Sequence, residues 1–187
     1  MSEENVEIVR FRISIPDRTR RRTVSEHVLV RLPFLARPLA SAWARLPPRS
    51  ALRRRLLAWV VRRGAEAANR RDFDFLFLAL DPEIEFRFTG EFIPPDFLGW
   101  QRGHEGYRRV WNAGIETWED LRLEFEEVID LGNRLLLCGR QLGHGTASGV
   151  LVSQPMFQLH TLRNGLVIRQ ENFTDRAQAL EAAGLSE

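Results

Sequence analysis

Alternating apolar and polar positions recur from residue 83 onward, and this period of two predicts β-strands. The predicted strands cover residues 83–88, 120–130, 134–144, 150–162 and 167–174. Asn164-Gly165 separates the last two, and this dipeptide is the strongest short-range indication of a two-residue hairpin turn. We therefore expect four antiparallel strands after residue 120.

The longer period of amphipathic helices marks much of the remaining chain. Helices are expected over residues 24–32, 34–46, 51–70, 73–80, 104–118 and 176–183. Thr23-Val-Ser-Glu26 forms a capping box before the first helix, and Pro47-Pro48 ends the second. Residues 8–15 alternate weakly, as an edge strand would, and residues 89–103 form a long loop of the kind used as lids.

From residue 51 onward the helices come mainly before the strands, which is typical of an α+β fold. The sheet must curl over the helices to bury their shared apolar faces, and the resulting shape is a cone with a pocket inside. The proline pair marks the one expected boundary. It separates an arginine-rich, partly helical extension, residues 1–50, from the domain, residues 51–187.

The hairpin turn also sets an expected pairing of its two strands. The predicted pairs are Arg163 with Leu166, His160 with Arg169, Gln158 with Glu171, and Met156 with Phe173. One face then carries Met156, Gln158, His160, Arg169, Glu171 and Phe173, and the other carries Phe157, Leu159, Thr161, Ile168, Gln170 and Asn172. Both faces mix polar and apolar residues, so the pattern leaves open which one is buried.

All 27 basic residues are arginine, and they are unevenly placed. Residues 1–71 hold 17 Arg against 6 Asp or Glu, whereas residues 72–187 hold 10 Arg against 19. This asymmetry is typical of an arm that binds nucleic acid or an anionic membrane, but it equally suits a basic extension lying on an acidic body. Because apolar residues recur at near-helical spacing in residues 24–46, we expect that segment to dock on the domain.

The single cysteine, Cys138, lies in an apolar run, so no disulfide can form within one chain. The acidic start has no apolar stretch behind it, unlike a signal peptide, and no uncharged apolar run approaches the roughly 18 residues of a membrane span. These features favour a cytoplasmic protein. The four histidines and one cysteine have no spacing that suits a metal, and we expect neither metal nor cofactor.

Five motifs follow one another at characteristic spacing. They are Glu66-Ala-Ala-Asn-Arg-Arg-Asp72, Leu80-Asp-Pro-Glu-Ile-Glu-Phe86, Arg102-Gly-His-Glu-Gly106, Leu162-Arg-Asn-Gly-Leu-Val-Ile168 and the tail Asp175-Arg-Ala-Gln-Ala-Leu-Glu-Ala-Ala-Gly-Leu185. Together they resemble the SnoaL-like branch of the nuclear transport factor 2-like superfamily, over residues 51–187. The resemblance implies the cone but no single activity, because this fold hosts isomerases, cyclases, dehydratases, epoxide hydrolases and non-catalytic binders.

The resemblance also implies that the hairpin face carrying Gln158 and Glu171 is the pocket wall. In the family's ketosteroid isomerases the oxyanion-hole acid falls at the position of Gln158, and the general base falls at or next to Phe86. The helix-borne tyrosine of those enzymes has no counterpart in residues 64–69. Steroid isomerisation by that mechanism is therefore not expected.

Glu171 and His160 are the predicted catalytic residues. Inside an apolar cone the pKa of Glu171 would rise toward a range useful for acid/base chemistry, and His160 would stay neutral. Such groups suit enolisation, ring closure or dehydration of a carbonyl compound, whereas a satisfied polar network is the purely structural alternative. The predicted ligand-binding residues are Phe86, Trp100, His104, Tyr107, Trp111, Met156, Gln158, Arg169 and Phe173.

We therefore expect a protein that binds a small apolar carbonyl-containing molecule, with conversion of the isomerase, cyclase or dehydratase type as an option. A non-catalytic ligand-binding or dimerisation module is the first alternative. A peripheral membrane or nucleic-acid binder acting through the basic arm is the second. Phe157, Leu159 and Ile168 would leave an apolar patch on the outer sheet face, which predicts a homodimer through that face.

Overall fold

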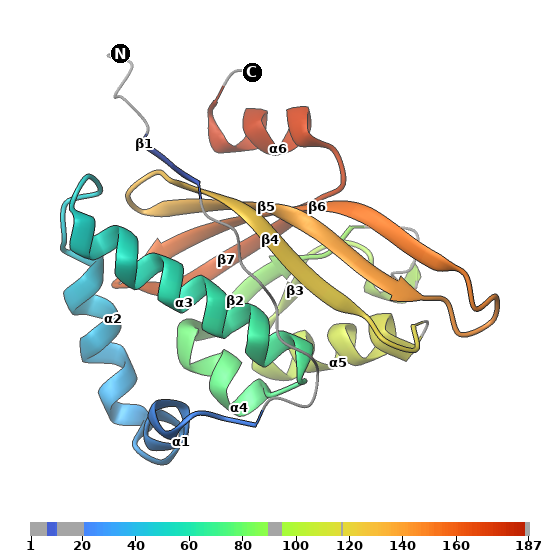
Figure 1. Ribbon diagram of the computed structural model, residues 1–187, viewed down its shortest axis with the longest axis horizontal. Helices are drawn as coiled ribbons and strands as arrows, with labels where there is room; N and C mark the ends of the chain where they lie inside the picture. The colour runs from blue at the N-terminus through green and yellow to red at the C-terminus, as the bar shows by residue number, and fades with distance from the viewer. Residues whose placement is uncertain (1–6, 11–20, 90–94, 117, 186–187) are drawn as a thin grey trace.

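The computed structural model describes residues 7–10, 21–89, 95–116 and 118–185, and within these ranges one seven-stranded sheet organises the protein (Figure 1). The strand order is β1-β4-β5-β6-β7-β2-β3, and neighbours are antiparallel except for the parallel pair β2 and β7. The strands are β1 (Glu7–Arg10), β2 (Leu80–Arg87), β3 (Gln101–Arg102), β4 (Arg122–Asp130), β5 (Arg134–His144), β6 (Leu151–Arg163) and β7 (Leu166–Phe173).

The helices begin where the sequence predicted their caps. The capping box at Thr23 is formed, and the side chains of Ser50, Asp72 and Asp175 each accept a hydrogen bond from a first-turn backbone N–H. The α-helices are α1 (Val24–Arg31), α2 (Ala36–Ala44), α3 (Ala51–Asn69), α4 (Phe73–Leu76), α5 (Gly103–Glu116) and α6 (Arg176–Ala183). Three short 3₁₀ turns are η1 (Pro33–Leu35), η2 (Phe77–Ala79) and η3 (Pro95–Phe97).

The helices cover both sides of the sheet, which gives the predicted α+β cone. Figure 1 shows α3, α4 and α5 on one side of the sheet and α6 on the other. The inner side holds the main core, in which fully buried Leu57 of α3 meets Ile84 and Phe86 of β2 and Val128 of β4. The weak strand expected near the N-terminus is β1, at the sheet edge beside β4, while its continuation over residues 11–15 lies outside the described residues.

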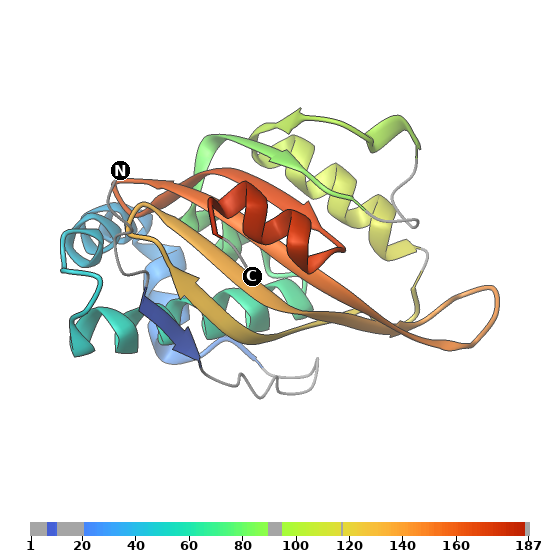
Figure 2. The same ribbon diagram turned by 90° about the horizontal axis from the view of Figure 1, so that it is seen from above.

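The outer sheet face is not an exposed apolar patch. Phe157 and Leu159 are only 7% and 4% exposed, because Ala179 and Leu180 of α6 pack on them. Figure 2, seen from above, shows α6 lying across these strands. The patch from which we predicted a homodimer is therefore covered, and the homodimer stays a prediction without it.

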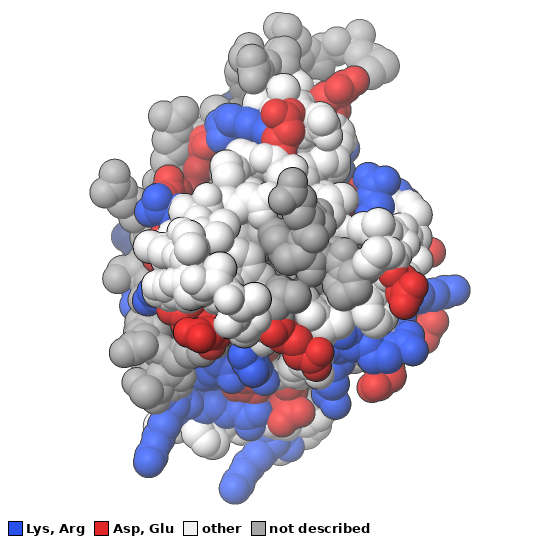
Figure 3. All heavy atoms as spheres, turned by 90° about the vertical axis from the view of Figure 1, so that its right-hand side faces the viewer, with Lys and Arg blue, Asp and Glu red and all other residues white. Residues whose placement is uncertain are grey.

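Exposed apolar side chains instead gather at the far end of the β5–β6 hairpin. Val150 and Leu151, which follow its turn, are 59% and 57% exposed. Figure 3 faces this end of the molecule, where a mainly uncharged surface is bordered below by arginine and acidic side chains.

A β-bulge in β7 overturns most of the predicted hairpin register. Arg163 lies opposite Leu166 as expected, but Leu162 pairs with Val167 and Thr161 with Arg169, so Ile168 is an extra residue. Because side chains alternate along a strand, one inserted residue exchanges the two faces of everything beyond it. The predicted partners of His160, Gln158 and Met156 are therefore wrong. His160 lies opposite Gln170, and Gln158 lies opposite Asn172.

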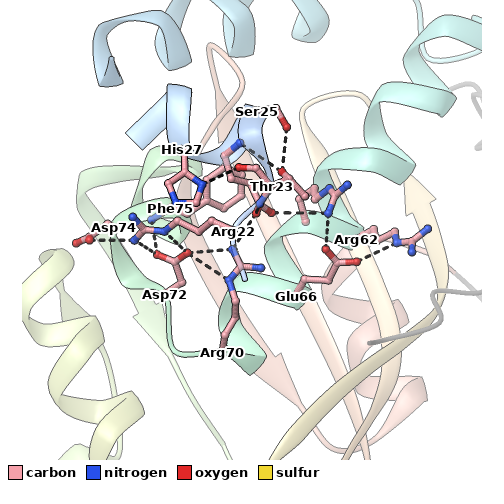
Figure 4. Close-up of polar contacts among 12 residues, drawn as sticks. Arg22, Thr23, Ser25, His27, Arg62, Glu66, Arg70, Asp72, Asp74 and Phe75 are labelled. Carbon is pink, nitrogen blue, oxygen red and sulfur yellow. Dashed lines mark hydrogen bonds and ion pairs between the residues drawn. The ribbon is translucent and has the colours of Figure 1, made fainter. Parts of the chain in front are cut away.

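A charged cluster fastens α1 to the domain (Figure 4). Glu26 is fully buried, accepts a hydrogen bond from the backbone N–H of Thr23 at 2.7 Å, and lies 3.4 Å from Arg70. Arg22 donates to the carboxylates of Asp72 and Asp74. Burial alone would raise the pKa of Asp72, but the hydrogen bonds from Arg22 and Arg70 outweigh it and lower that pKa.

A second anchor is Arg53 of α3, whose side chain is only 2% exposed. Its Nε and Nη2 donate to the Asp130 carboxylate at 2.7 and 2.9 Å. Its Nη1 donates to the carbonyls of Ala44 and Leu46, at 3.1 and 2.9 Å. One buried guanidinium thus ties the end of α2 to β4, and the segment 24–46 lies against the domain as the pattern predicted.

Candidate functional site

The inner face of the cone encloses a cavity of about 100 Å³ between the sheet and the helices α3 and α5. Strand alternation turns Gln158 and His160 of β6 into it, and the bulge turns Gln170 of β7 into it. Tyr107 and Trp111 project into it from α5, one helical turn apart. Four predicted site residues, Tyr107, Trp111, Gln158 and His160, therefore meet in one place.

A chain of hydrogen bonds orders one wall of this cavity. The Tyr107 hydroxyl donates to Gln170 Oε1 at 3.2 Å, and Gln170 Nε2 donates to Asn172 Oδ1 at 2.9 Å. Burial raises the pKa of the Tyr107 phenol, so the hydroxyl stays protonated at neutral pH. We did not predict Gln170 and Asn172, because without the bulge both belong to the opposite face.

Two polar atoms at the cavity are buried without a hydrogen-bond partner among the described residues. They are Nε2 of His160 and Nε1 of Trp111. Burial lowers the pKa of His160 to about 4, because the imidazolium would lose its hydration. At neutral pH the ring is therefore uncharged. A ligand that reaches these two atoms would meet a neutral imidazole and an indole N–H donor.

A smaller cavity of about 40 Å³ lies toward the C-terminal end of α5. Trp111 and Gln158 line it as well as the larger cavity. Met156, a predicted ligand-binding residue, also lines it. Phe173 lines it too, although it lies opposite Phe157 instead of the predicted Met156 and also packs against the α6 side of the sheet.

Arg169 and Glu171 lie on the outer face, because the bulge moves them there. The carboxylate of Glu171 is 3.2 Å from Arg169 Nε and 3.4 Å from Arg87 Nη2. Trp100 joins this cluster, with the Arg169 guanidinium 3.9 Å from its ring centroid. The predicted pocket positions of Arg169, Glu171 and Trp100 are therefore wrong, and the three residues form a surface ion-pair and cation–π cluster.

Phe86 and His104 lie beside the cavity without lining it. Phe86 is fully buried and packs edge-on against Tyr107, with 5.0 Å between ring centroids. His104 stacks on Phe77, and its Nε2 lies 3.2 Å from the Leu80 carbonyl oxygen. Both residues support the α5 wall, and neither is part of the cavity lining.

Neither a candidate metal cluster nor a helix suited to cross a membrane occurs in the described ranges. Within them, no three His, Cys, Asp or Glu side chains gather as a metal ion would require. None of the helices there combines the length and the apolar character that crossing a membrane needs.

Comparisons with known proteins support the architecture. An NTF2-like protein of unknown function from Burkholderia pseudomallei matches with a TM-score of 0.57 and 22% identity, over 66% of this chain and 94% of that one. TerC, crystallised with polyporic acid, matches with a TM-score of 0.56 and 18% identity, over 66% and 95%. IdmH, a proposed polyketide cyclase from Streptomyces antibioticus, matches with a TM-score of 0.55 and 16% identity, over 68% and 98%.

At these identities the structural matches show the fold alone. No curated protein sequence matches the chain. The family model of the SnoaL-like domain matches residues 61–170, which is more than half of the chain. The protein therefore belongs to the SnoaL-like domain family.

Proposed function

We propose that this protein binds a small neutral carbonyl compound in the cone cavity, with the carbonyl end directed at His160 and Trp111. The observation that carries this proposal is the buried Nε2 of His160, which has no partner among the described residues. A buried polar atom without a partner costs free energy, and a ligand that hydrogen-bonds to it recovers that cost. A carbonyl oxygen can accept from the Trp111 indole N–H, whose Nε1 is likewise buried without a described partner.

The cavity favours an uncharged ligand. Among the described residues that line it, the side chains that can titrate are His160 and Tyr107. Burial lowers the pKa of His160 and raises that of Tyr107, so both are neutral near pH 7. A carboxylate or ammonium group would lose its hydration there without gaining an opposite charge.

His160 is the proton-transfer group that this proposal favours. When Nε2 carries no hydrogen it can accept a proton from a carbon next to the ligand carbonyl, while the Trp111 indole N–H donates to the carbonyl oxygen and stabilises the resulting enolate. In the other tautomer Nε2–H donates to that oxygen, which binds the ketone without proton transfer. Such a step belongs to enolisation, ring closure and dehydration alike. The name of IdmH, a proposed polyketide cyclase, is consistent with a carbonyl ligand in a related fold. Glu171 has no part in this scheme, because it lies on the outer face.

The test uses 2-pentanone as a minimal neutral ketone and isothermal titration calorimetry as the measurement. His160→Leu should weaken its binding at least about 10-fold, because the variant removes a buried hydrogen-bonding group. Glu171→Gln, the matched control on the outer face, should bind as the wild-type protein does. Equal affinity of His160→Leu and wild-type protein would overturn the proposal.

Two further expectations accompany this function. A reducing, cytoplasmic location is supported by the free and buried thiol of Cys138. Weak binding to nucleic acid and membranes is supported by the docking of the arm, in which Arg22 and Arg53 are already engaged with Asp72 and Asp130.

A further inference from the structure

We infer that the N-terminal extension builds a second compartment for the same ligand, and that the ligand is a neutral carbonyl compound carrying a long apolar chain. The carbonyl end would occupy the cone cavity and the chain would occupy a groove between the extension and the domain. This inference rests on the proposed function for the position of the carbonyl end. The groove, the wall that it shares with the cavity and the size of the cavity each support it.

The groove has a volume of about 440 Å³ and lies between α1, α2, α3 and the segment α4–η2. Its described lining is apolar apart from Arg63, whose guanidinium is paired with Glu66 at 2.7 Å. Leu39 and Leu52 line it while remaining 59% and 56% exposed. Ligand sites typically have about 300–1,000 Å³ and a mainly apolar lining. The groove is therefore large enough and apolar enough for a hydrocarbon chain.

The groove and the cone cavity meet along a shared wall. The residues that line both are Trp43, Val60, Gly64, Leu76, Ala79 and Gly165. Gly64 lies in the interior of α3, where glycine weakens a helix. A Cβ added there would have no atom within 4 Å, and its backbone is not in the left-handed region. Neither conformation nor close packing requires glycine, so Gly64 leaves open space in the shared wall. In this inference the ligand chain passes there.

The cone cavity is too small to hold a sizeable ligand alone. Its volume of about 100 Å³ is below the roughly 300–1,000 Å³ of typical ligand sites. The polar atoms of His160 and Trp111 lie in this small compartment, and the apolar surface lies mainly in the larger one. This division matches a molecule with one polar end and a long apolar remainder.

Specific contacts hold the outer wall of the groove in place. Ser41 of α2 donates a hydrogen bond to the Asn164 carbonyl at 3.2 Å. A Cβ at Gly165 would lie 2.2 Å from the Ala40 carbonyl oxygen, so the hairpin turn and α2 approach too closely for any other residue. The family model begins at residue 61, so α1 and α2 lie outside the part of the chain that it matches.

The first experiment compares the affinities of 2-pentanone and 2-undecanone for the wild-type protein by calorimetry. We expect 2-undecanone to bind at least about 100-fold more tightly, because six more methylene groups leave water. Equal affinities would overturn the inference while leaving the proposed function standing. Conversely, suppose that 2-undecanone binds tightly to the wild-type protein and equally tightly to His160→Leu. That result would support the groove as the site of the chain and would overturn the proposed position of the carbonyl group.

The second experiment closes the passage with Gly64→Leu. This variant should bring the affinity for 2-undecanone to within about 5-fold of that for 2-pentanone, because the chain can no longer pass between compartments. Gly64→Ala, whose methyl group enters open space, is the matched control and should keep most of the preference. An undiminished preference in a folded Gly64→Leu protein would contradict the shared passage.

Leu39→Glu tests the same idea without touching the core, since Leu39 is 59% exposed on α2. It should reduce the affinity for 2-undecanone at least about 10-fold, because the new carboxylate lies in the apolar groove, and it should leave 2-pentanone unaffected. Pelleting with neutral phosphatidylcholine vesicles tests whether the groove binds a lipid surface instead. Vesicle binding that Leu39→Glu abolishes, together with no dependence on ketone length, would assign the groove to a lipid surface and overturn the inference.

Discussion

The cone cavity and the groove between the extension and the domain differ in both size and polarity. The cavity has about 100 Å³ and contains the unpartnered polar atoms of His160 and Trp111, whereas the groove has about 440 Å³ and a lining that is apolar except for the ion-paired Arg63. The SnoaL-like domain supplies most of the cavity lining, and the extension supplies one wall of the groove and Trp43, which lines both. The contrast indicates that one fold can obtain its site for a polar group and its site for an apolar chain from separate parts of the sequence.

The largest expected effect comes from removing the buried ion pair that ties the extension to the domain. Arg53→Ala leaves the buried carboxylate of Asp130 without its partner, and we expect it to lower the free energy of unfolding by about 3–5 kcal/mol. Arg55→Ala, at an exposed position of the same helix, should change it by less than about 0.5 kcal/mol. Urea unfolding of both variants measures the difference, and a cost below about 1 kcal/mol for Arg53→Ala would mean that the regions are held together elsewhere.

The neutral character of the cavity should appear as a pH dependence of stability. The pKa of His160 is about 4 in the folded protein, against 6.5 for a free imidazole. The contribution of neutral His160 to the free energy of unfolding is therefore complete above pH 6.5 and is lost as pH falls toward 4. Between pH 6.5 and pH 4 the free energy of unfolding should fall by up to about 1.4 kcal/mol per pH unit, or about 3 kcal/mol in all. The free energies of unfolding of wild-type protein and His160→Leu, compared at pH 7 and pH 4.5, isolate this contribution from other groups. Identical pH dependences would show that His160 is not buried in neutral form.

The hydrogen-bonded wall of the cavity should contribute a smaller amount. Tyr107→Phe removes the donor to Gln170 Oε1 and leaves that buried oxygen unpaired, so we expect a loss of about 1–2 kcal/mol by urea unfolding. Trp111→Phe is the comparison, because its indole Nε1 has no described partner to lose. A smaller cost for Tyr107→Phe than for Trp111→Phe would argue against the ordered wall.

The smallest expected effect is a gain in stability at the junction of the two compartments. Gly64→Ala should raise the free energy of unfolding by about 0.5–1 kcal/mol, because alanine favours a helix interior and its methyl group meets no atom within 4 Å. Gly143→Ala should do the opposite, since its Cβ would lie 2.6 Å from the Trp118 ring. A loss of stability in Gly64→Ala would mean that the space beside Gly64 is filled.

Much of the fold could be predicted because its signals are local. The caps at Thr23, Ser50 and Asp72 and the Asn164-Gly165 turn depend on residues close in sequence, and each was confirmed. Arg53 and Asp130 are 77 residues apart, and nothing local indicates that pair. The packing of α6 on the outer sheet face was not predicted either, although the apolar residues of both surfaces, such as Leu180 and Leu159, are present in the sequence.

The candidate site was predicted only in part, and the bulge explains the difference. His160 and Gln158 lie on β6, which has regular alternation, and both line the cavity as expected. Arg169 and Glu171 lie beyond Ile168 on β7, so the inserted residue moved them to the outer face and brought Gln170 inward. Three successive apolar residues at 166–168 break the alternation, and they were the one available sign that the pairing would shift.

The central claim, a neutral carbonyl-binding cavity at His160, is tested most directly by ¹⁵N NMR of the histidine rings during titrations with pH and 2-pentanone. The chain has 4 histidines, and His160→Leu identifies the resonance that belongs to His160. We predict a pKa of about 4 for this ring and a shift of its Nε2 resonance when 2-pentanone is added at pH 7. A ring that titrates near its ordinary value and whose resonances 2-pentanone leaves unchanged would contradict the account.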